Sequence, residues 1–320
     1  MKVPRVLVTG ASGFIGEAVI FRLLLDKMSS PIAATRGSTC LLGLCPVVPF
    51  DLVDSEVLPS LDDIDVVVHA AARVHVMKET AVDALTEFRK VNVDGTLRLA
   101  RHAAKAGVAR FIFISSIKVN GENTSQRNPF KADDTPAPAD PYGLSKYEAE
   151  ESLKQLSRDT GMEVVIIRPP LVYGPGVKAN FQKMMQWLDK GIPLPLGAIG
   201  NQRSLVAIGN LVDLIVTCIS HPAAANQTFL VCDDEDLSTT LLLQRLAQAL
   251  GKKPRLLPFP QWLLMFIASI LGKRAVAQRI CGSLQVDIEK TRELLGWLPP
   301  VKVDEAIRKT AAHYLEKQTK

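Results

Sequence analysis

The sequence predicts an α/β protein with a doubly wound parallel sheet, followed by a smaller mixed α/β lobe. Short apolar runs rich in β-branched residues alternate with longer helical patterns through the first half of the chain. Strands that are apolar throughout are typical of a parallel sheet covered by helices on both faces. A glycine-rich turn follows the first such run, and beyond Pro169 prolines and glycines loosen the pattern. The 320 residues suffice for one large domain or two joined ones.

The first half supplies six strands in order, because each run is short, apolar and bounded by turn residues. The strands are expected at residues 5–9, 31–35, 47–50, 65–70, 111–115 and 163–168. Between them, apolar residues at helical spacing predict helices. These helices are expected at 14–27, from about Asp83 to Ala106 as one or two helices, and from Pro141 to about Thr160.

Composition and charge exclude several classes of function. The net charge of +5 is mild, and no block of Lys and Arg is dense enough to predict a nucleic-acid surface. The five cysteines are scattered without a Cys-x-x-Cys pair or a His cluster, so no metal site or disulfide framework is expected. Reduced thiols, and an N-terminus without signal-peptide features, predict a cytoplasmic protein.

One apolar segment raises the question of membrane contact. The run QWLLMFIASIL, at residues 261–271, is followed by Lys273 and Arg274. These eleven residues are too few to span a bilayer as a helix, which takes about 20. A buried or lid helix is the favoured interpretation. The alternative is a weak peripheral contact with a membrane, with Trp262 at one end of the segment.

The glycine-rich turn joins the first predicted strand to the first predicted helix, in the motif TGASGFIG. Its glycines permit a tight turn that lets the backbone approach a pyrophosphate, and the helix N-terminus supplies N–H donors. Residues 1–169 are therefore expected to form a Rossmann-type dinucleotide-binding domain. Residues 170–320 are expected to form a substrate lobe, with some chain returning to the sheet. The predicted cofactor contacts in the turn are Gly10, Ser12, Gly13, Phe14, Ile15 and Gly16.

Tyr142 and Lys146 are four residues apart, which places both side chains on one face of the predicted helix. Pro141 is suited to open that helix, because its fixed φ fits the first helical position. A free tyrosine has a pKa near 10, and a neighbouring positive charge lowers that value. Such a pair can exchange protons near neutral pH, although the same spacing also occurs by chance in exposed helices.

With these motifs, the chain resembles the extended short-chain dehydrogenase/reductases, the NAD-dependent epimerase/dehydratase family of nucleotide-sugar enzymes. The resemblance covers nearly the whole chain, through motifs in a fixed order. The motifs are TGASGFIG (9–16), Asp51-Leu52, HAAA (69–72), VNVDGT with Asn92, FISSIKVNG (113–121), YGLSK (142–146), RPPLVYGPG (168–176), NQRSLVAIGNLVDL (201–214) and LLGWLPP (294–300). Within the family, the chain looks most like bacterial 4-reductases of UDP-4-keto-6-deoxy-N-acetylhexosamines, which serve O-antigen synthesis.

The resemblance implies a catalytic set of Ser116, Tyr142 and Lys146. Ser116 would hydrogen-bond the sugar oxygen that becomes a carbonyl, and Tyr142 would give or take the proton on it. Lys146 would hold the nicotinamide ribose and lower the pKa of Tyr142, and the cationic nicotinamide would add to that effect. Ser115 is the alternative to Ser116, with contact to the backbone or the substrate as its expected role.

The resemblance also implies further contacts with the cofactor. Asp51 and Leu52 would contact the adenine. Asn92 would support the active-site backbone, and Pro169 would pack near the nicotinamide. His69, at the end of an apolar strand, is expected to be packed rather than catalytic. The residues implied to line the cofactor cleft are Ala70, Ala71 and Ala72.

On the substrate side, the resemblance implies that Arg203 binds the diphosphate of a UDP-sugar, because a guanidinium can hold two oxygens at once. Tyr173 and Asn180 would contact the sugar, and Arg279 would be a second phosphate clamp. The alternatives are a surface role for Arg203 and a solvated helix charge for Arg279. Asn120 replaces the tyrosine of the family's usual Val-Tyr-Gly, which puts any sugar contact from that loop in doubt.

The end of the second strand departs from the pattern of NAD-binding proteins. Those proteins usually carry an acidic residue there, which binds the adenosine ribose. Here the strand ends Ala-Ala-Thr and is followed by Arg36. A cation at this position favours the 2′-phosphate of NADP(H). The alternative is that Arg36 stacks on the adenine and that the chain binds NAD(H).

The predicted reaction is NAD(P)H-dependent 4-keto reduction of a UDP-linked 6-deoxy-N-acetylhexosamine, of the N-acetylquinovosamine or N-acetylfucosamine type. One alternative is a UDP-sugar 4-epimerase with tightly bound NAD. The other is a non-catalytic, dinucleotide-sensing scaffold of the same fold. The resemblance further implies a homodimer formed through the helix of Tyr142 and its neighbour.

Overall fold

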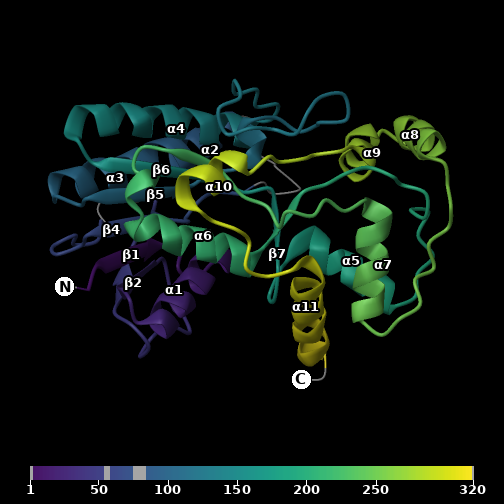
Figure 1. Cartoon of the computed structure of the whole chain (residues 1–320), viewed down its shortest axis with the longest axis horizontal. Coiled ribbons are helices and arrows are strands. Elements are labelled where there is room, and N and C mark those ends of the chain that lie inside the picture. The colour runs from purple at the N-terminus through teal and green to yellow at the C-terminus, as the bar shows by residue number, and fades with distance from the viewer. Residues whose placement is uncertain (1–2, 54–57, 75–83, 319–320) are drawn as a thin grey trace.

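The computed structural model describes residues 3–53, 58–74 and 84–318, which form a helix-covered sheet with a lobe beside it (Figure 1). Within these residues, seven parallel strands make the main sheet, in the order β3-β2-β1-β4-β5-β6-β9. The predicted α/β fold with a doubly wound parallel sheet is confirmed. The strands are β1 (Arg5–Thr9), β2 (Ser30–Thr35), β3 (Val47–Pro49), β4 (Val66–His69), β5 (Arg110–Ile114), β6 (Glu163–Arg168) and β9 (Thr228–Leu230).

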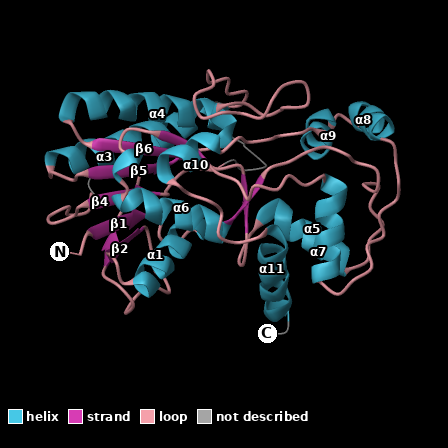
Figure 2. Ribbon diagram, in the orientation of Figure 1, coloured by secondary structure: helices cyan, strands magenta, loops and turns pink. Residues whose placement is uncertain are grey.

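Helices cover both faces of this sheet (Figure 2). On one face, α1 (Phe14–Asp26) and α6 (Ile208–Ser220) share an apolar core with the strands. On the other face, α3 (Thr96–Lys105) and α4 (Pro141–Thr160) share a second core. Successive residues of β1 enter opposite cores, because side chains alternate along a strand. The central residues of the strands are therefore apolar on both sides of the sheet, which is the pattern that predicted them.

The helix predicted from Asp83 to Ala106 is broken into segments, and Asp83 itself lies outside the described residues. The described segments are α2 (Ala84–Arg89), the π-helical η1 (Lys90–Gly95) and α3. A Cβ on Gly95 would lie 2.5 Å from the Leu52 carbonyl oxygen, so η1 packs directly on the chain after β3. The periodicity of apolar residues cannot predict the π-helical turn of η1. The contact of Gly95 that accompanies this turn is with Leu52, which is distant in the sequence.

The smaller lobe has its own apolar core and its own two-stranded parallel sheet, β7 (Leu171–Tyr173) with β8 (Leu205–Ala207). The core lies between α5 (Ala179–Asp189), α7 (Thr239–Ala249) and α11 (Val303–Gln318). From this lobe the chain returns to the main sheet, since β9 pairs with β6.

Two helices, α8 (Gln261–Ile270) and α9 (Arg274–Cys281), lie at the end of the molecule away from the sheet (Figure 1). A further helix, α10 (Glu289–Leu295), leads back toward the sheet. Two short 3₁₀ helices are η2 (Ile117–Val119) and η3 (Pro222–Ala224). In the part of the chain that the structure describes, no helix combines the length and the apolar character needed to cross a membrane.

The loop between η2 and α4 is joined to the chain between α9 and α10. Thr124 N donates a hydrogen bond to Ser283 O at 2.9 Å. Phe130 exchanges backbone hydrogen bonds with Gln285 and Asp287, each at 2.9 Å. The loop that follows the predicted catalytic serine is therefore held in place by the C-terminal part of the chain.

Candidate active site

The glycine-rich turn between β1 and α1 has the tight geometry that its sequence predicts. Gly10 has a φ of +66°, and a Cβ there would lie 2.8 Å from the backbone of Ala71. A Cβ on Gly16 would lie 2.3 Å from the Gly10 carbonyl oxygen. Gly13 is the N-cap of α1 and gives the helix no side-chain hydrogen bond, so the first N–H groups of α1 remain for another acceptor. The same turn and first helical turn contain Ser12, Phe14 and Ile15.

Tyr142 and Ser116 lie together, at the start of α4 and directly after β5. Pro141 opens α4, and Asp140 caps it by accepting a hydrogen bond from Gly143 N at 2.7 Å. Burial raises the pKa of Tyr142 to about 12, the charge of Asp140 also raises it, and a hydrogen bond with Ser116 lowers it. The phenol is therefore protonated at neutral pH and can act as a proton donor.

Lys146 is buried one turn further along α4. Its ammonium donates a hydrogen bond to the Ile114 carbonyl oxygen at 2.8 Å and lies 4.2 Å from the centre of the Phe113 ring. Burial lowers the pKa of Lys146 to about 7, and the charge of Glu150 opposes that effect. The expected lowering of the Tyr142 pKa is therefore not found in the protein alone. The effect of burial on the phenol prevails, and Lys146 is only partly charged at neutral pH.

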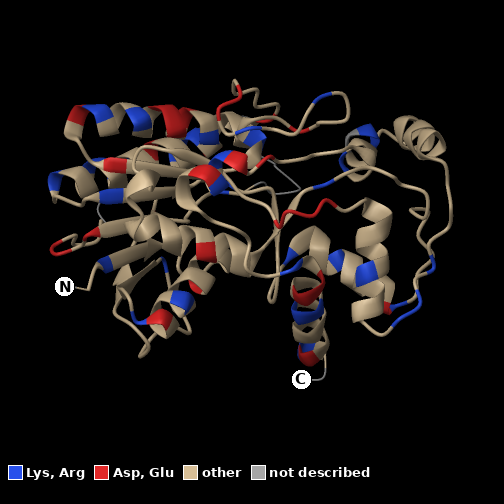
Figure 3. Cartoon of the chain, in the orientation of Figure 1, with Lys and Arg blue, Asp and Glu red and all other residues tan. Residues whose placement is uncertain are grey.

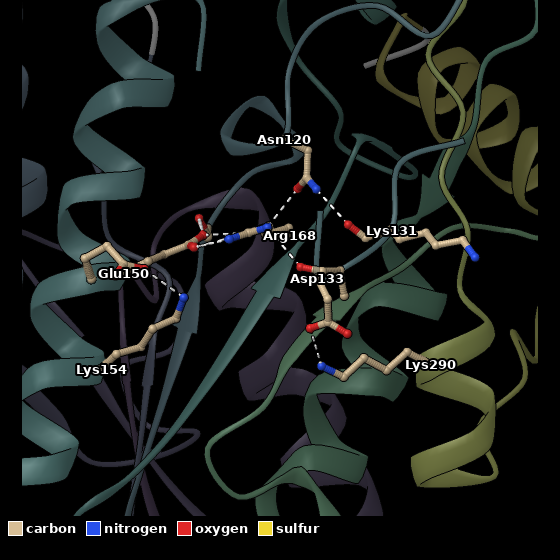
Figure 4. A network of polar contacts seen from close by, with 10 residues as sticks. Asn120, Lys131, Asp133, Glu150, Lys154, Arg168 and Lys290 are labelled. Carbon is tan, nitrogen blue, oxygen red and sulfur yellow. Dashed lines mark hydrogen bonds and ion pairs between the residues drawn. The ribbon is translucent and has the colours of Figure 1, made fainter. Parts of the chain in front are cut away.

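One turn after Lys146 along α4, Glu150 forms an ion pair with Arg168 in the interior, and Figure 4 shows this pair. Glu150 has no exposed surface, and Arg168 is 2% exposed. Arg168 Nε donates to the two carboxylate oxygens at 2.9 and 3.2 Å. Ser115 is also buried and donates its hydroxyl hydrogen to Glu150. The hydroxyl hydrogen of Ser115 is therefore used within the core, and the substrate contact suggested for Ser115 stays a prediction.

Asn120 belongs to the same buried network (Figure 4). Its Oδ1 accepts a hydrogen bond from Arg168 Nη1 at 2.9 Å, and its Nδ2 donates to the Lys131 carbonyl oxygen at 2.8 Å. Nearby, the Lys290 ammonium lies 2.7 Å from Asp133 Oδ1. Asn120 therefore ties the loop after η2 to the end of β6, at the position where the family usually has tyrosine.

Asn92 fastens η1 to its surroundings. Its Oδ1 accepts a hydrogen bond from Arg73 N at 2.9 Å, and its Nδ2 donates to Arg73 O and Ser145 Oγ at 3.1 Å each. The chain after β4 and the first turn of α4 are thereby held together. Half-buried residues lie between β4 and Arg73, beside the glycine turn, namely Ala70, Ala71 and Ala72.

His69 is a packed residue, as expected. It has no exposed surface, and its two ring nitrogens lie 2.7 Å from Thr9 Oγ1 and 3.0 Å from Thr96 Oγ1. Burial lowers the pKa of His69 to about 3, and the nearby charge of Lys146 lowers it further. The imidazole is therefore neutral at physiological pH.

The residues predicted on the adenine side follow β2 and β3, which are neighbours in the sheet next to β1. Arg36 is exposed directly after β2. Asp51 accepts a hydrogen bond from Val53 N at 2.8 Å, and the buried Leu52 presents its carbonyl oxygen to Arg98. The structure therefore brings these residues to the sheet edge that carries the glycine turn.

Tyr173 does not have the position expected of a sugar contact. It has no exposed surface, lies in the core of the lobe, and donates its hydroxyl hydrogen to Asp233 Oδ2 at 2.8 Å. Asp233 Oδ1 also accepts hydrogen bonds from Ala207 N and Asn210 Nδ2, at 2.8 and 2.7 Å. Tyr173 is therefore a core residue, and the predicted contact is corrected.

The side chain of Arg203 contacts the backbone of Arg279, the other arginine predicted to bind a diphosphate. Arg203 Nη1 donates to the carbonyl oxygens of Arg279 and Gly282, at 2.8 and 3.1 Å. Arg203 is half-buried, whereas the side chain of Arg279 is exposed on α9. Asn180 is exposed in the first turn of α5.

Pro169 directly follows β6 and lies beside the chain after Ser116, the predicted catalytic serine. Its carbonyl oxygen accepts a hydrogen bond from Ile117 N at 3.0 Å, which fixes the backbone immediately after Ser116.

Sequence reasoning missed Glu150, although two signals for it were present. Glu150 lies four residues after Lys146, so it continues the helix face that carries Tyr142. Arg168 is a cation at the end of the apolar strand EVVIIR, where an interior partner of opposite charge is required.

A parallel sheet, an uncapped glycine turn at the first helix, and a Ser–Tyr–Lys group at the carboxyl end of the strands define a dinucleotide-binding protein of Rossmann type. Residues 6–232 match the model of the NAD dependent epimerase/dehydratase family. The chain is 48% identical, over 322 residues, to a UDP-glucose 4-epimerase of Vibrio cholerae, a match that covers 98% of this chain and 97% of that protein. The chain therefore belongs to the NAD-dependent epimerase/dehydratase family.

Solved structures show the same fold. The UDP-glucose 4-epimerase of Thermotoga maritima with UDP-glucose superposes with a TM-score of 0.78 at 24% identity, covering 99% of this chain and 100% of that one. The UDP-glucuronic acid 4-epimerase of Bacillus cereus in complex with NAD also gives 0.78, at 21% identity over 98% and 99% of the two chains.

Proposed function

We propose that the protein is a UDP-sugar 4-epimerase that works with a retained NAD. The observation that carries this proposal is the 48% identity, across nearly the full length of both chains, to a UDP-glucose 4-epimerase. It favours the epimerase alternative over the 4-keto reduction that the sequence motifs first indicated. UDP-glucose and UDP-galactose are the substrates to test first.

The residues present fit a dinucleotide. Gly13 leaves the first N–H groups of α1 without a side-chain cap, which suits a pyrophosphate. Gly10 and Gly16 keep side chains away from the turn. Asp51 and Leu52 would lie against the adenine, and the chain after β4 would line the cleft. NAD, when bound, would supply a reversible acceptor for the hydride from the sugar C4.

In the proposed reaction, Tyr142 takes the proton of the sugar C4 hydroxyl and later returns it. Ser116 binds the same oxygen and the Tyr142 phenol, so both groups act on one atom. The protonated phenol, with its pKa of about 12, serves the return step. A positive charge near the phenol favours removal of the proton in the forward step, and Lys146 in its protonated form, buried one turn further along α4, would supply it.

Arg203 and Arg279 are the proposed partners of the diphosphate. Arg203 donates both of its hydrogen bonds to backbone carbonyl oxygens from one nitrogen, Nη1. These bonds fix the orientation of the guanidinium and of its other two nitrogens. Arg203 is half-buried, and burial lowers its pKa, so a bound anion would compensate the buried charge.

Two assays test the proposal together. The purified protein should convert UDP-glucose to UDP-galactose without added nucleotide, and denaturation should release NAD that lacks a 2′-phosphate. Conversion that depends on added NADPH, or release of NADP, would overturn the epimerase assignment.

One observation favours a second candidate, the NADP(H)-dependent 4-ketoreductase. Arg36 is exposed at the end of β2, where a 2′-phosphate would lie, and no carboxylate ends that strand. This candidate predicts net consumption of NADPH with a UDP-4-keto sugar, and a preference for NADPH over NADH that Arg36→Ala removes. An unchanged preference in Arg36→Ala would exclude it.

A further inference from the structure

The outer face of α8 is apolar and exposed. Trp262, Phe266 and Ile270 follow one another at intervals of four residues, so they lie along one face of the helix. Their exposed fractions are 70, 61 and 70%. A helix on the surface of a globular protein normally turns polar residues outward, and α8 does not.

The inner face of the same helix is apolar too. Leu264 and Ala268 lie opposite the exposed stripe and are half-buried, and no residue of α8 is fully buried. The exposed apolar surface continues through Ile267 and Leu271, which are 40 and 63% exposed. We call the exposed set the α8 patch, consisting of Trp262, Phe266, Ile267, Ile270 and Leu271. A contiguous apolar patch of this kind marks a contact surface.

The segment around the patch carries charge of one sign. Residues 237–286 contain seven Lys or Arg and no Asp or Glu. Two of the seven, Arg245 and Lys252, form ion pairs with acidic residues from outside this segment. Figure 3 shows Lys and Arg (blue) on α9 and on the loop before α8. It shows no Asp or Glu (red) on α8 or α9. The exposed cations include Lys253, Arg255, Lys273 and Arg274.

This combination determines what can cover the patch. A second copy docked through α8 would bring two segments of the same positive charge together, which is unfavourable. A bilayer containing anionic lipid offers apolar chains to the patch and negative headgroups to the exposed Lys273 and Arg274, which follow the helix. We propose that the α8 patch inserts into the interfacial layer of an anionic membrane, with Lys273 and Arg274 at the headgroups.

The geometry allows contact with the surface of a bilayer and not passage through it. A helix of ten residues is about 15 Å long, half the thickness of the hydrocarbon layer. Trp262 at one end and the basic pair after the other end are residues that prefer the membrane–water boundary. The helix therefore lies along the membrane surface, while the sheet stays in water.

Vesicle flotation tests this proposal on the full-length protein. At low salt, the protein should float with vesicles of phosphatidylcholine and phosphatidylglycerol, and at least tenfold less with phosphatidylcholine alone or at high salt. The triple variant Trp262→Ser/Phe266→Ser/Ile270→Ser should lose flotation by at least tenfold. The matched control, Leu25→Ser/Leu42→Ser, removes apolar residues that are 79 and 77% exposed elsewhere, and it should float like the wild type.

The outcomes separate the proposal from its rivals. Membrane docking would be refuted if the wild-type protein did not float with the anionic vesicles at low salt. It would also be refuted if the triple variant floated with them as well as the wild type does. A wild-type dimer that the triple variant dissociates in sedimentation, without flotation of either, would show instead that a second copy covers the patch. Circular dichroism and the melting temperature of the triple variant establish that it is folded.

A second measurement locates the contact within the molecule. Of the three tryptophans, Trp262 is the most exposed, and Trp187 and Trp297 are 43 and 5% exposed. Lipids with brominated chains should quench the wild-type fluorescence. Trp262→Phe, which keeps an apolar side chain, should still float but lose most of that quenching. Quenching that survives in Trp262→Phe would place the contact elsewhere and reject the α8 patch.

Discussion

Tyr142, Lys146 and Glu150 follow one another at intervals of four along α4, and burial shifts the pKa of the first two. Burial keeps the phenol protonated and brings the ammonium to the edge of its charged range, with a pKa of about 7. Glu150 opposes the loss of charge on Lys146 and itself depends on Arg168. Tyr142, the residue proposed to transfer the proton, thus shares a helix face with Lys146 and Glu150, which lead to the buried Arg168.

The role of the phenol can be tested by removing its hydroxyl alone. Tyr142→Phe should lower turnover of the UDP-sugar by about 10²–10⁴-fold, because the proton of the C4 oxygen loses its donor and acceptor. Binding of the nucleotide cofactor and the melting temperature should stay near wild type. Tyr147→Phe is the matched control. If Tyr142→Phe keeps more than about a tenth of wild-type turnover, the general acid–base role is wrong.

The buried ion pair should matter for stability rather than directly for chemistry. Glu150→Gln leaves the Arg168 charge without its partner in the interior, so the free energy of unfolding should fall by about 3–5 kcal/mol. Glu151→Gln removes an exposed partner of Lys154 and should cost less than about 1 kcal/mol. Denaturant titration measures both.

The double variant Glu150→Met/Arg168→Met tests whether the stability loss of Glu150→Gln comes from the unpaired charge of Arg168 or from lost packing. It removes both charges, so it should be more stable than Glu150→Gln. A double variant that is less stable than the single one would mean that the hydrogen bonds of Arg168 to the loop outweigh the charge effect.

The lowered pKa of Lys146 predicts how stability changes with pH. Between about pH 7 and pH 10.5, the unfolded chain keeps the Lys146 proton while the folded, cofactor-free protein releases it. The unfolded state then binds more protons, so this residue makes the free energy of unfolding rise with pH in that window. Lys146→Met should remove the rise, and Lys154→Met, at a half-buried position on the same helix where the ammonium pairs with Glu151, should keep it. Equal slopes in all three proteins would contradict the burial of the charge.

Elements with a purely local signal were predicted closely, and those shaped by distant contacts were not. β1 and β6 begin and end at the predicted residues, because each is a continuous apolar run between turn residues. α4 begins at Pro141, as its cap sequence indicates. The π-helical η1 escaped prediction, since it is associated with the packing of Gly95 on Leu52.

The packing of η1 can be tested with one methyl group. In Gly95→Ala, the new Cβ would lie 2.5 Å from the Leu52 carbonyl oxygen, so η1 or the chain after β3 must shift. We expect a loss of about 1–3 kcal/mol in the free energy of unfolding. Gly37→Ala, where the added Cβ meets nothing within 4 Å, is the matched control and should be nearly neutral. An equal effect of both substitutions would argue against this contact.

At the scale of the whole molecule, the sheet and the lobe depend on each other. α6 and β9 come from the second half of the chain yet belong to the core and the edge of the main sheet. The glycine turn and the Ser116–Tyr142–Lys146 group could be predicted because they occupy short motifs at fixed places in this fold. The positions of Ser115 and Tyr173 could not, because their partners, Glu150 and Asp233, are brought to them only by folding. The homodimer stays a prediction.

This dependence predicts where the chain can be divided. A fragment of residues 1–169 lacks α6 and β9, so it should leave an apolar sheet face and the edge of β6 uncovered. A fragment of residues 1–232 contains both and should be markedly less prone to aggregate. Light scattering measures the aggregation of each fragment, and thermal or denaturant unfolding shows whether each one unfolds cooperatively. Cooperative unfolding of the shorter fragment would show that the first 169 residues form an independent unit.

The pairing of β6 with β9 also has a consequence for synthesis on the ribosome. β6 ends at Arg168, and its partner strand ends at Leu230. At about 5–20 residues per second, the apolar strand EVVIIR emerges several seconds before the strand that will cover its edge has been made. An unpaired apolar edge invites pairing with other nascent chains. The newly made protein therefore passes through an interval in which a holding chaperone, or slower growth at low temperature, would decide how much of it reaches the folded state.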